Sequence, residues 1–437
     1  MNLPSDDVPA LAVDAAELAL VDDNYRQVRP IPGSRMFEVR EALSVYRRGD
    51  PEAEVFDASQ GDGGASLPGV PGELLERAFH LQREHGTGYD KPCGTPRFRQ
   101  AVVDAYWQLD PALGWGVDNC IACQGGRDAL LKAYEAMCAL GHGRRGDFIV
   151  TTRVPWISYT WGPYSIGTNV MLAPGTEQSA WQLTAEGVEA CVEHAARSGG
   201  RRVAGLVITS PDNPTGRSMP VADQAALATR AFEQGVPFVL FDWIYHRVTD
   251  ESPYDVNALL RAVAPEHRDR CIVLDGLTKS LGASNVRSAH LLAGKDVVLR
   301  IQKNASHGVI PSFYAQAVAI AAYEGGFEAA AATIVEPTNA SRAVLLEALR
   351  ERELEAITGK GYYAFINLAP WIDRAKMADS GEIGTYLAEK HGLAVVPGIH
   401  FSQFARTWIR FSYALPPDKT RRAVERLGRA LDAIDRG

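Results

Sequence analysis

The sequence lacks the features of disulfide-rich, secreted and membrane-spanning proteins. It has only six cysteines among 437 residues, too few and too scattered for a disulfide scaffold. No apolar run reaches the roughly 18 residues that a membrane span requires. The opening segment has two early acidic residues and no basic region of the kind that begins a secretory signal. We therefore expect a cytoplasmic protein without a membrane partner.

Basic residues are scarce relative to acidic ones. The chain carries 45 lysines and arginines against 53 aspartates and glutamates, a formal net charge of −8, and no block of basic residues stands out. A nucleic-acid partner is therefore disfavoured. The composition, 46% hydrophobic and 22% charged, is that of an ordinary globular protein. The length exceeds the ~250 to 300 residues at which one hydrophobic core stops growing, so we expect two domains.

Two of the cysteines, Cys120 and Cys123, form a CxxC motif within the apolar stretch NCIAC. Neither a second CxxC nor a pair of histidines follows at the spacing of metal ligands. A zinc or redox role for this pair is the less favoured alternative. We expect the two side chains to pack in the core of a buried strand, and we expect no metal site.

Residues 1–70 divide into an arm and a short structured segment. Residues 1–33 show no clear period and are rich in proline toward their end, which indicates an extended N-terminal arm. From Ser34, a capping residue followed by apolar residues at helical spacing predicts a helix that ends near Gly49. Residues 53–62 predict a short strand that runs into a glycine turn at Gly61 and Gly63. We assign residues 34–70 to a small domain.

Residues 71–325 alternate between helical and strand patterns, which indicates a large domain of βα units. Apolar, β-branched strands between amphipathic helices predict a largely parallel sheet covered on both faces, with the active site beyond the carboxyl ends of the strands. The predicted helices lie at 72–86, 96–109, 126–140 and 221–235, and the predicted strands at 119–123, 147–152, 203–210, 237–242 and 271–276.

Residues 326–437 change to a different pattern, which indicates the C-terminal part of the small domain. A long helix is predicted at 337–352 and a final helix at the end of the chain, with strands at 362–368, 393–398 and 407–414. Together with residues 34–70, this part forms a smaller α+β domain.

Polar groups follow four of the predicted strands in the large domain. Gly125 and Gly126 follow the first strand and open a helix, so their backbone N–H groups offer an anion site. Asn213 lies in the turn PDNPTG, where its amide can meet a polar ring substituent. Asp242 ends another strand, and Tyr245 comes three residues later. A buried acid there has a raised pKa unless a cation faces it.

The stretch GLTKSLGASNVR, residues 276–287, follows the last of these strands. Arg287, with its planar fork, and the Thr278 hydroxyl suit a phosphate monoester. The amine of Lys279 can form an imine with an aldehyde once nearby positive charge depresses its pKa. The four strand ends thus describe one ligand with a phosphate, an aldehyde and a basic ring nitrogen. Pyridoxal 5'-phosphate has all three.

The ordered motifs NPTG, D-x-x-Y, and K-x-x-G ending in arginine at the eighth position resemble the class I/II, aspartate-aminotransferase-like family of fold type I pyridoxal phosphate enzymes. The resemblance covers about residues 35–435. It implies an α/β fold with a mostly parallel, seven-stranded sheet, covered by helices, and a smaller α+β domain. It also implies that Lys279 is the Schiff-base lysine that moves the substrate proton, and that Asp242 keeps the ring nitrogen protonated. Tyr245 and Asn213 then resemble the pair that bonds the cofactor 3-oxygen.

The same resemblance assigns the remaining site residues. Trp156 takes the position of the aromatic ring that stacks on the pyridine and borders the substrate. Arg410, in WIRFSYA, resembles the arginine that binds the substrate α-carboxylate, and Gly61 and Asn213 lie on the substrate side. Tyr89 matches a tyrosine that reaches the phosphate of a neighbouring subunit, which implies a homodimer with shared active sites. The positions on the phosphate side are Gly125, Gly126, Arg127, Thr278 and Arg287.

Three positions bear on how closely the family pattern is followed. Gly276 stands where a serine often precedes the lysine by three residues, so one phosphate contact is missing. Gln302 stands where one branch has an intersubunit arginine for dicarboxylate side chains. Arg127 occupies a position where some bacterial members carry a lysine that reads the distal carboxylate. Whether Arg127 does the same, or binds phosphate or solvent, stays open.

The leading functional hypothesis is an aminotransferase that passes an amino group from an L-amino acid to a 2-oxo acid such as 2-oxoglutarate. A lyase or synthase, working by β-elimination, replacement or cyclisation, is the alternative at the same site. The fold also serves as the effector domain of some transcription regulators. Those carry a winged helix-turn-helix, which the ~33 residues before the first predicted helix cannot hold.

Overall fold

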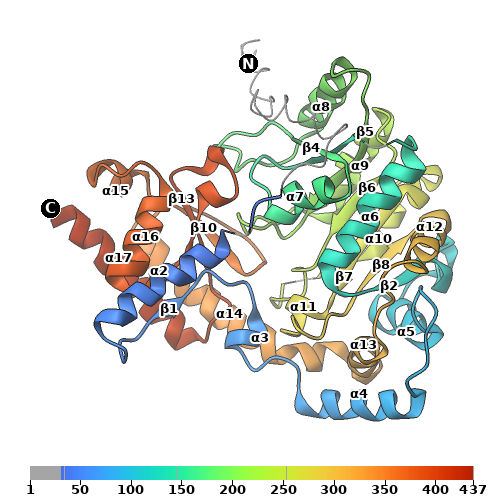
Figure 1. Ribbon diagram of the computed structural model, residues 1–437, viewed down its shortest axis with the longest axis horizontal. Helices are drawn as coiled ribbons and strands as arrows, with labels where there is room; N and C mark the ends of the chain where they lie inside the picture. The colour runs from blue at the N-terminus through green and yellow to red at the C-terminus, as the bar shows by residue number, and fades with distance from the viewer. Residues whose placement is uncertain (1–30, 34, 145, 252, 437) are drawn as a thin grey trace.

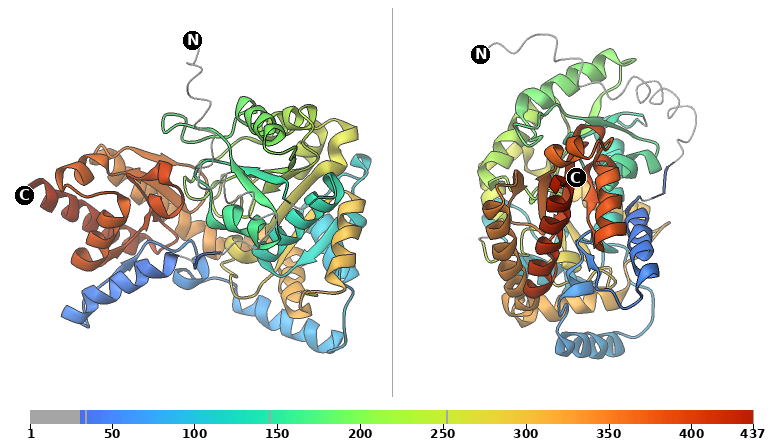
Figure 2. Two further views of the ribbon diagram at one scale, coloured as in Figure 1. Left: turned by 45° about the horizontal axis from the view of Figure 1, so that its top comes forward. Right: turned by 90° about the vertical axis from the view of Figure 1, so that its left-hand side faces the viewer.

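The computed structural model describes residues 31–33, 35–144, 146–251 and 253–436. Nearly all of the predicted arm, and the predicted helix cap Ser34, lie outside the described residues. Two lobes lie side by side along the long axis of the molecule, as Figures 1 and 2 show. The assignment of 1–33, 34–70, 71–325 and 326–437 to an arm and two domains stays a prediction.

The larger lobe is built on a seven-stranded sheet, and the predicted α/β fold class is confirmed. The strand order is β2-β8-β7-β6-β5-β3-β4; β8 runs antiparallel to both of its neighbours, and the other pairs are parallel. The strands are β2 (Cys120–Cys123), β3 (Phe148–Thr151), β4 (Asn169–Leu172), β5 (Val203–Thr209), β6 (Val239–Asp242), β7 (Cys271–Gly276) and β8 (Ala289–Ala293). The sequence had predicted all of these except β4 and β8.

Helices cover both faces of this sheet because its strands are apolar on both sides. In β6, for example, Val239 and Phe241 join one hydrophobic cluster and Leu240 joins another, as the two-residue period of a strand requires. The helices of this lobe are α4 (Gly72–His85), α5 (Pro96–Gln100), α6 (Gly125–Gly141), α7 (Ile157–Ser165), α8 (Ala185–Arg197), α9 (Val221–Glu233), α10 (Val256–Ala262), α11 (Leu277–Ser280), α12 (Lys295–Ala305) and α13 (Phe313–Gly325). The helix predicted at 96–109 is α5 followed by a π-helical turn, Ala101–Tyr106.

The second lobe combines an antiparallel sheet, ordered β12-β13-β10-β9, with helices and with the N-terminal segment. Its β1 pairs with β11 in parallel, so residues near the start of the described chain complete this lobe. Figure 1 shows α2 lying along the C-terminal helices. The elements are α2 (Met36–Gly49), β1 (Phe56–Asp57), α3 (Gly63–Ser66), α14 (Phe327–Glu351), β9 (Ala356–Thr358), β10 (Tyr363–Asn367), α15 (Ala369–Arg374), α16 (Ser380–His391), β11 (Leu393–Ala394), β12 (Val396–Pro397), β13 (Trp408–Ser412) and α17 (Pro417–Arg436).

The long helix α14 differs from its predicted bounds. Its start was predicted at Pro337, a residue type that is common in the first turn of a helix. In the structure α14 begins ten residues earlier, at Phe327, and Pro337 lies in its interior. The helix passes through the proline because Ala330, Ala331 and Ile334 are buried against neighbouring elements, and this packing outweighs the loss of one backbone hydrogen bond.

The lengths of the helices bear on whether the chain could span a membrane. Among the described residues, no single helix is long and apolar enough to cross a bilayer. The helices α13 and α14 meet at a bend of 97° and reach the required length and composition only as a pair. Nearly every residue of α13 from Ala315 to Tyr323 is buried inside the larger lobe.

The close approach of β7 and β8 explains why glycine stands at position 276. A Cβ atom on Gly276 would lie 2.6 Å from both the Ser288 carbonyl oxygen and Ala289 Cα, so no larger residue fits without moving β8. We expect Gly276→Ser to lower the free energy of unfolding by about 1–3 kcal/mol through overpacking. Denaturant unfolding measures the change. In the control Gly72→Ser, the new Cβ has no atom within 4 Å, and stability should change by less than about 0.5 kcal/mol. Equal stability of the two variants would contradict the explanation.

Candidate active site

The carboxyl ends of neighbouring parallel strands meet at one edge of the large sheet, and the predicted site residues follow them. β5 leads into the turn with Asn213, β6 ends at Asp242, and β7 leads into α11 with Lys279. These three strands are adjacent in the sheet. The second lobe adds Arg410 from β13, which faces the same edge, since it bonds to Asn213.

The Lys279 amine lies against the N-terminal segment. Its Nζ donates a hydrogen bond of 2.5 Å to the Gly61 carbonyl oxygen and lies 5.6 Å from the centre of the Tyr245 ring. Burial lowers the pKa of this amine, the Asp62 carboxylate opposes the shift, and three arginines reinforce it, with a net pKa of about 8. The arginines are Arg410, Arg127 and Arg287. A lysine with this pKa is partly neutral near physiological pH, and the neutral amine is the nucleophile.

Asp242 is fully enclosed and is held in place by two donors. The Tyr159 hydroxyl donates to Oδ2 at 2.8 Å, and the backbone N–H of Ile244 donates to Oδ1 at 3.1 Å. Burial raises the pKa of Asp242 to about 6, although both bonds lower it. A cation placed against this carboxylate would gain a strong, desolvated partner. Tyr159 was not foreseen, although it lies three residues after Trp156 in the sequence.

Arg410 joins the two lobes through a chain of hydrogen bonds. The side chain is only 2% exposed. Its Nη1 donates to Asn213 Oδ1 and its Nη2 to the Ser59 carbonyl oxygen, each at 2.6 Å. The guanidinium also lies 4.3 Å from the centre of the Tyr363 ring. Its Nε is buried without a hydrogen-bond partner, so the fork keeps donor capacity for a further acceptor.

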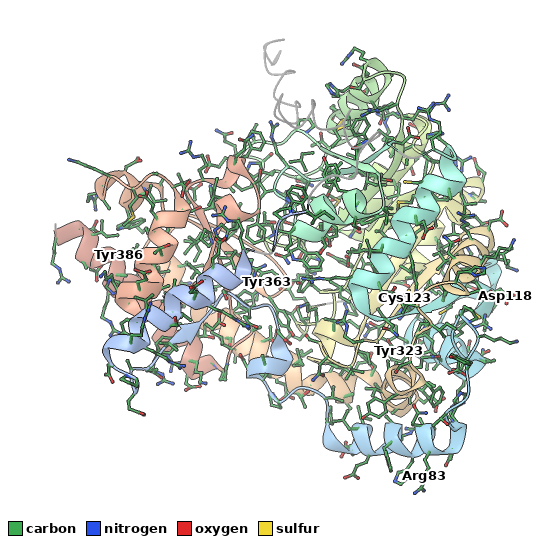
Figure 3. All side chains as sticks on the ribbon, in the orientation of Figure 1. Arg83, Asp118, Cys123, Tyr323, Tyr363 and Tyr386 are labelled. Carbon is green, nitrogen blue, oxygen red and sulfur yellow. The ribbon has the colours of Figure 1, made fainter. Side chains whose placement is uncertain are left out.

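Tyr363 is a second residue that the sequence did not predict as part of the site. Its hydroxyl lies 2.8 Å from the Tyr245 hydroxyl, which in turn accepts from Asn213 Nδ2 at 3.3 Å. Figure 3 labels Tyr363 at the junction of the two lobes. A Cβ atom on Gly61 would lie 1.7 Å from the Tyr363 hydroxyl oxygen, so only glycine fits beside this ring. Gly61 is therefore required by the packing of the N-terminal segment against Tyr363 of β10.

The predicted phosphate side has unsatisfied donors around the N-terminus of α6. The Thr278 hydroxyl is buried and has no hydrogen-bond partner. Arg287 donates to the carbonyl oxygens of Ser284 at 2.7 Å and Gln124 at 3.2 Å. A Cβ atom on Gly125, which has φ +78°, would lie 2.3 Å from Arg287 Nη2. An arginine, a free hydroxyl and a helix N-terminus in one place fit a phosphate group.

Trp156 and Arg127 lie together beside this region. Trp156 precedes the first turn of α7 and packs edge-to-face on Tyr159, with ring centres 5.6 Å apart. The exposed Arg127, in the first turn of α6, places its guanidinium 5.3 Å from the centre of the Trp156 ring. Gly126 precedes Arg127 in the same turn. The structure therefore brings all of the predicted phosphate-side residues to one edge of the sheet.

Tyr89 is the predicted residue that the structure does not bring to the others within one chain. Its side chain is fully exposed, at 101% of its reference area. Gln302, where the sequence departs from one branch of the family, is half-buried in α12. Asp62 was not predicted as a site residue. It accepts a hydrogen bond of 2.7 Å from the Ser284 hydroxyl, and its negative charge raises the pKa of Lys279.

The cysteines lie away from this chemistry. All six are free and buried, and burial raises the pKa of the Cys123 thiol to about 12. Cys120 and Cys123 lie three residues apart in β2, so they point to opposite faces of the sheet and join different hydrophobic clusters. Within the described residues, no group of three histidines, cysteines, aspartates or glutamates is arranged to hold a metal ion.

Known proteins resemble this chain over most of its length. The family model described as aminotransferase class I and II matches residues 60–427. The aspartate aminotransferase of Geobacillus stearothermophilus is 25% identical over 371 residues, which cover 83% of this chain and 88% of the relative. The aspartate/prephenate aminotransferase of Thermus thermophilus is 27% identical over 369 residues, with the same coverage of 83% and 88%.

Solved structures show a similar fold. The aspartate aminotransferase from Thermus thermophilus with maleate superposes with a TM-score of 0.76 at 23% identity, covering 92% of this chain and 97% of that one. The aspartate aminotransferase from Rhizobium meliloti gives a TM-score of 0.78 at 21% identity, covering 93% and 98%.

The reactivity of Lys279 should follow its lowered pKa. Because only the neutral amine is nucleophilic, acylation of Lys279 in the cofactor-free protein should speed up as pH rises through about 8. Peptide mass mapping of the labelled protein measures this midpoint. Asp62→Asn removes the charge that raises the pKa, so the midpoint should move to lower pH, whereas Ser284→Ala, which keeps that charge, should leave it in place. A midpoint above pH 10 would contradict the assignment.

Proposed function

The chain belongs to the aminotransferase class I and II family, and we propose that it transfers an amino group from an L-amino acid to a 2-oxo acid such as 2-oxoglutarate, with pyridoxal 5'-phosphate as cofactor. The observation that carries this proposal is the pairing of Lys279 with Asp242: an amine of lowered pKa and a buried carboxylate follow adjacent parallel strands. An amine and a carboxylate so placed suit an aldehyde at one end of a ring and a basic nitrogen at the other.

The residues present fit this cofactor. The unpartnered Thr278 hydroxyl, Arg287 and the N–H groups at Gly125 and Gly126 would hold the phosphate. Trp156 would cover one face of the ring. When bound, the cofactor supplies an aldehyde that captures amines and a pyridinium ring that accepts electrons from the substrate α-carbon.

The roles of the protein groups follow from their charges and bonds. Lys279 would supply the amine that holds the cofactor's aldehyde, and the same amine would carry a proton to and from the substrate α-carbon. Asp242, with a pKa of about 6, is ionised at neutral pH and would keep a proton on the ring nitrogen. Tyr159 supports that charge by donating to Asp242. Tyr245 and Asn213 would bond to the 3-oxygen of the ring.

Arg410 would bind the substrate α-carboxylate. Its fork is fixed before substrate arrives by Asn213 and the Ser59 carbonyl oxygen, so little side-chain freedom is lost on binding. Asn213 thus connects the group that holds the substrate with the group that holds the ring. Arg127 is placed to meet either the phosphate or an acidic substrate side chain, and the choice between them stays open.

A homodimer with shared active sites completes the proposal. Tyr89 is fully exposed on the single chain, so its ring is accessible to a partner subunit. We assign it to the phosphate of the neighbouring subunit.

Lys279→Ala tests the proposed reaction. We expect amino transfer to fall by at least about 10³-fold, because both the anchoring amine and the proton carrier are lost. Glutamate formed from 2-oxoglutarate and an amino donor is the readout, and borohydride reduction of the wild type should trap the cofactor on the peptide with Lys279. The control, Lys303→Ala, removes an exposed lysine of α12. Release of pyruvate and ammonia without an oxo acid would instead support a lyase.

Arg410→Lys tests the carboxylate contact. Lysine keeps the charge but not the two-pronged fork, so KM for both the amino acid and the oxo acid should rise about 10- to 100-fold with a smaller change in kcat. Steady-state kinetics with each substrate varied in turn give both constants. An unchanged KM for both substrates would rule out this role for Arg410.

A further inference from the structure

A cluster of buried titratable side chains lies behind the sheet, and the proposed function does not use it. Asp275 is 0% exposed, and His246, Tyr106 and His290 are also buried. Asp275 belongs to β7, where its neighbour Leu274 stands in register with Asp242 of β6. Because successive side chains of a strand point to opposite faces, Asp275 lies on the face of the sheet away from Asp242.

Asp275 uses both of its carboxylate oxygens. Its Oδ2 lies 2.8 Å from His246 Nε2 and also accepts the Tyr106 hydroxyl. Its Oδ1 accepts the backbone N–H of Gly276 at 2.7 Å. Gly276 is the last residue before α11, the helix that carries Lys279. The carboxylate therefore holds the exact point at which the chain leaves the sheet toward the lysine.

The hydrogen bonds fix the protonation of His246. The backbone N–H of Tyr254 donates to His246 Nδ1 at 2.9 Å, so this nitrogen must be the acceptor. The proton then sits on Nε2 and is donated to Asp275, which makes the pair a neutral imidazole and an ionised carboxylate. Burial lowers the pKa of His246, in agreement. Although burial alone would raise the pKa of Asp275, His246 and the other donors hold it below its usual value.

His246 belongs to the turn that carries the other half of the site. It comes four residues after Asp242 and directly after Tyr245, and its own N–H bonds to the Trp243 carbonyl oxygen at 2.9 Å. The bond from His246 to Asp275 therefore ties the turn after β6 to the end of β7. No site residue described above makes this link on the rear face.

We propose that Asp275, His246 and Tyr106 form a rear clamp, a set of positioning residues that fixes Lys279 relative to Asp242 and Tyr245 for the proposed transamination. The proposal rests on the proposed function, since it concerns the alignment of that site. The clamp residues do not touch substrate or cofactor; they act through the two turns. A shift of about 1 Å at a reacting group is enough to cost on the order of 100-fold in rate.

Other groups face the clamp and share its electrostatics. Arg247 lies 4.7 Å above the Tyr106 ring and pairs with Glu328 at 3.0 Å. His290 accepts the Trp107 indole N–H at 2.8 Å. The Tyr323 ring packs 4.4 Å from Tyr106, and Figure 3 labels Tyr323 in the larger lobe, apart from Tyr363 at the junction of the lobes. The variants below leave all of these groups in place.

A matched pair of substitutions separates clamping from simple core packing. His246→Gln keeps both bonds, because its amide oxygen can accept from the Tyr254 N–H while its NH₂ donates to Asp275. His246→Leu fills a similar space and keeps neither. We expect the leucine variant of the cofactor-loaded enzyme to lose at least about tenfold in kcat with KM changed less than about threefold, and the glutamine variant to stay within about threefold of wild type in both.

Asp275→Asn supplies a spectroscopic readout. The asparagine oxygen can still accept from Tyr106 and His246, but its NH₂ group would then face the Gly276 N–H, donor against donor. The pH midpoint of the visible absorbance of the bound cofactor reports the surroundings of Lys279. We expect this midpoint to shift by about half a unit or more in Asp275→Asn and His246→Leu, and to stay in place in His246→Gln.

A stability control completes the test. Val273→Ala removes buried methyl groups from the same strand, on the same face as Asp275, without touching a clamp bond. It should lower Tm and leave kcat and the midpoint unchanged. The clamp would be overturned if folded His246→Leu had the same kcat and pH midpoint as the wild type. It would also be overturned if Val273→Ala lost as much kcat as His246→Leu. Failure of the proposed function is distinguished because it would appear in the wild type, as no glutamate formed from 2-oxoglutarate, or as full activity in Lys279→Ala.

Discussion

The backbone ladder between β6 and β7 is the constraint on which the candidate site depends. Parallel neighbours in a sheet lie about 4.8 Å apart and end at the same edge, so the residues that follow them are close without any further device. Here the register of Asp242 with Leu274 places a carboxylate beside the point where β7 turns into α11. The separation of the acid and the amine is therefore set by backbone geometry, and side chains only refine it.

Burial at this edge changes both charged groups in directions that suit their roles. It makes the lysine less basic and the aspartate less acidic, so each group lies nearer to neutrality than it would in water. The second lobe contributes the arginine and tyrosine that surround them, and its bonds to the site include Arg410 to Asn213 and Tyr363 to Tyr245. The site thus lies between the two lobes. The larger lobe carries Lys279 and Asp242, and the second lobe carries Arg410 and Tyr363, which help to enclose them.

Residues that follow strands were predictable from the sequence because a strand pattern also gives the position of its end. Asp242, Lys279 and Asn213 belong to this class, and so does the parallel core of the fold. Tyr159, Tyr363 and Asp62 were missed because their roles arise from contacts between segments far apart in the chain. The strands β4 and β8 were missed although they are no shorter than the predicted strands β2, β3 and β6, and the start of α14 was wrong because burial overrode the local preference of proline.

Charges on opposite faces of the large sheet also affect each other. A layer only one backbone thick separates Asp275 from Asp242, and the charge of the first raises the proton affinity of the second. The reverse face of the sheet therefore offers a second way to adjust the acidity of Asp242, and one that leaves the ligand pocket untouched.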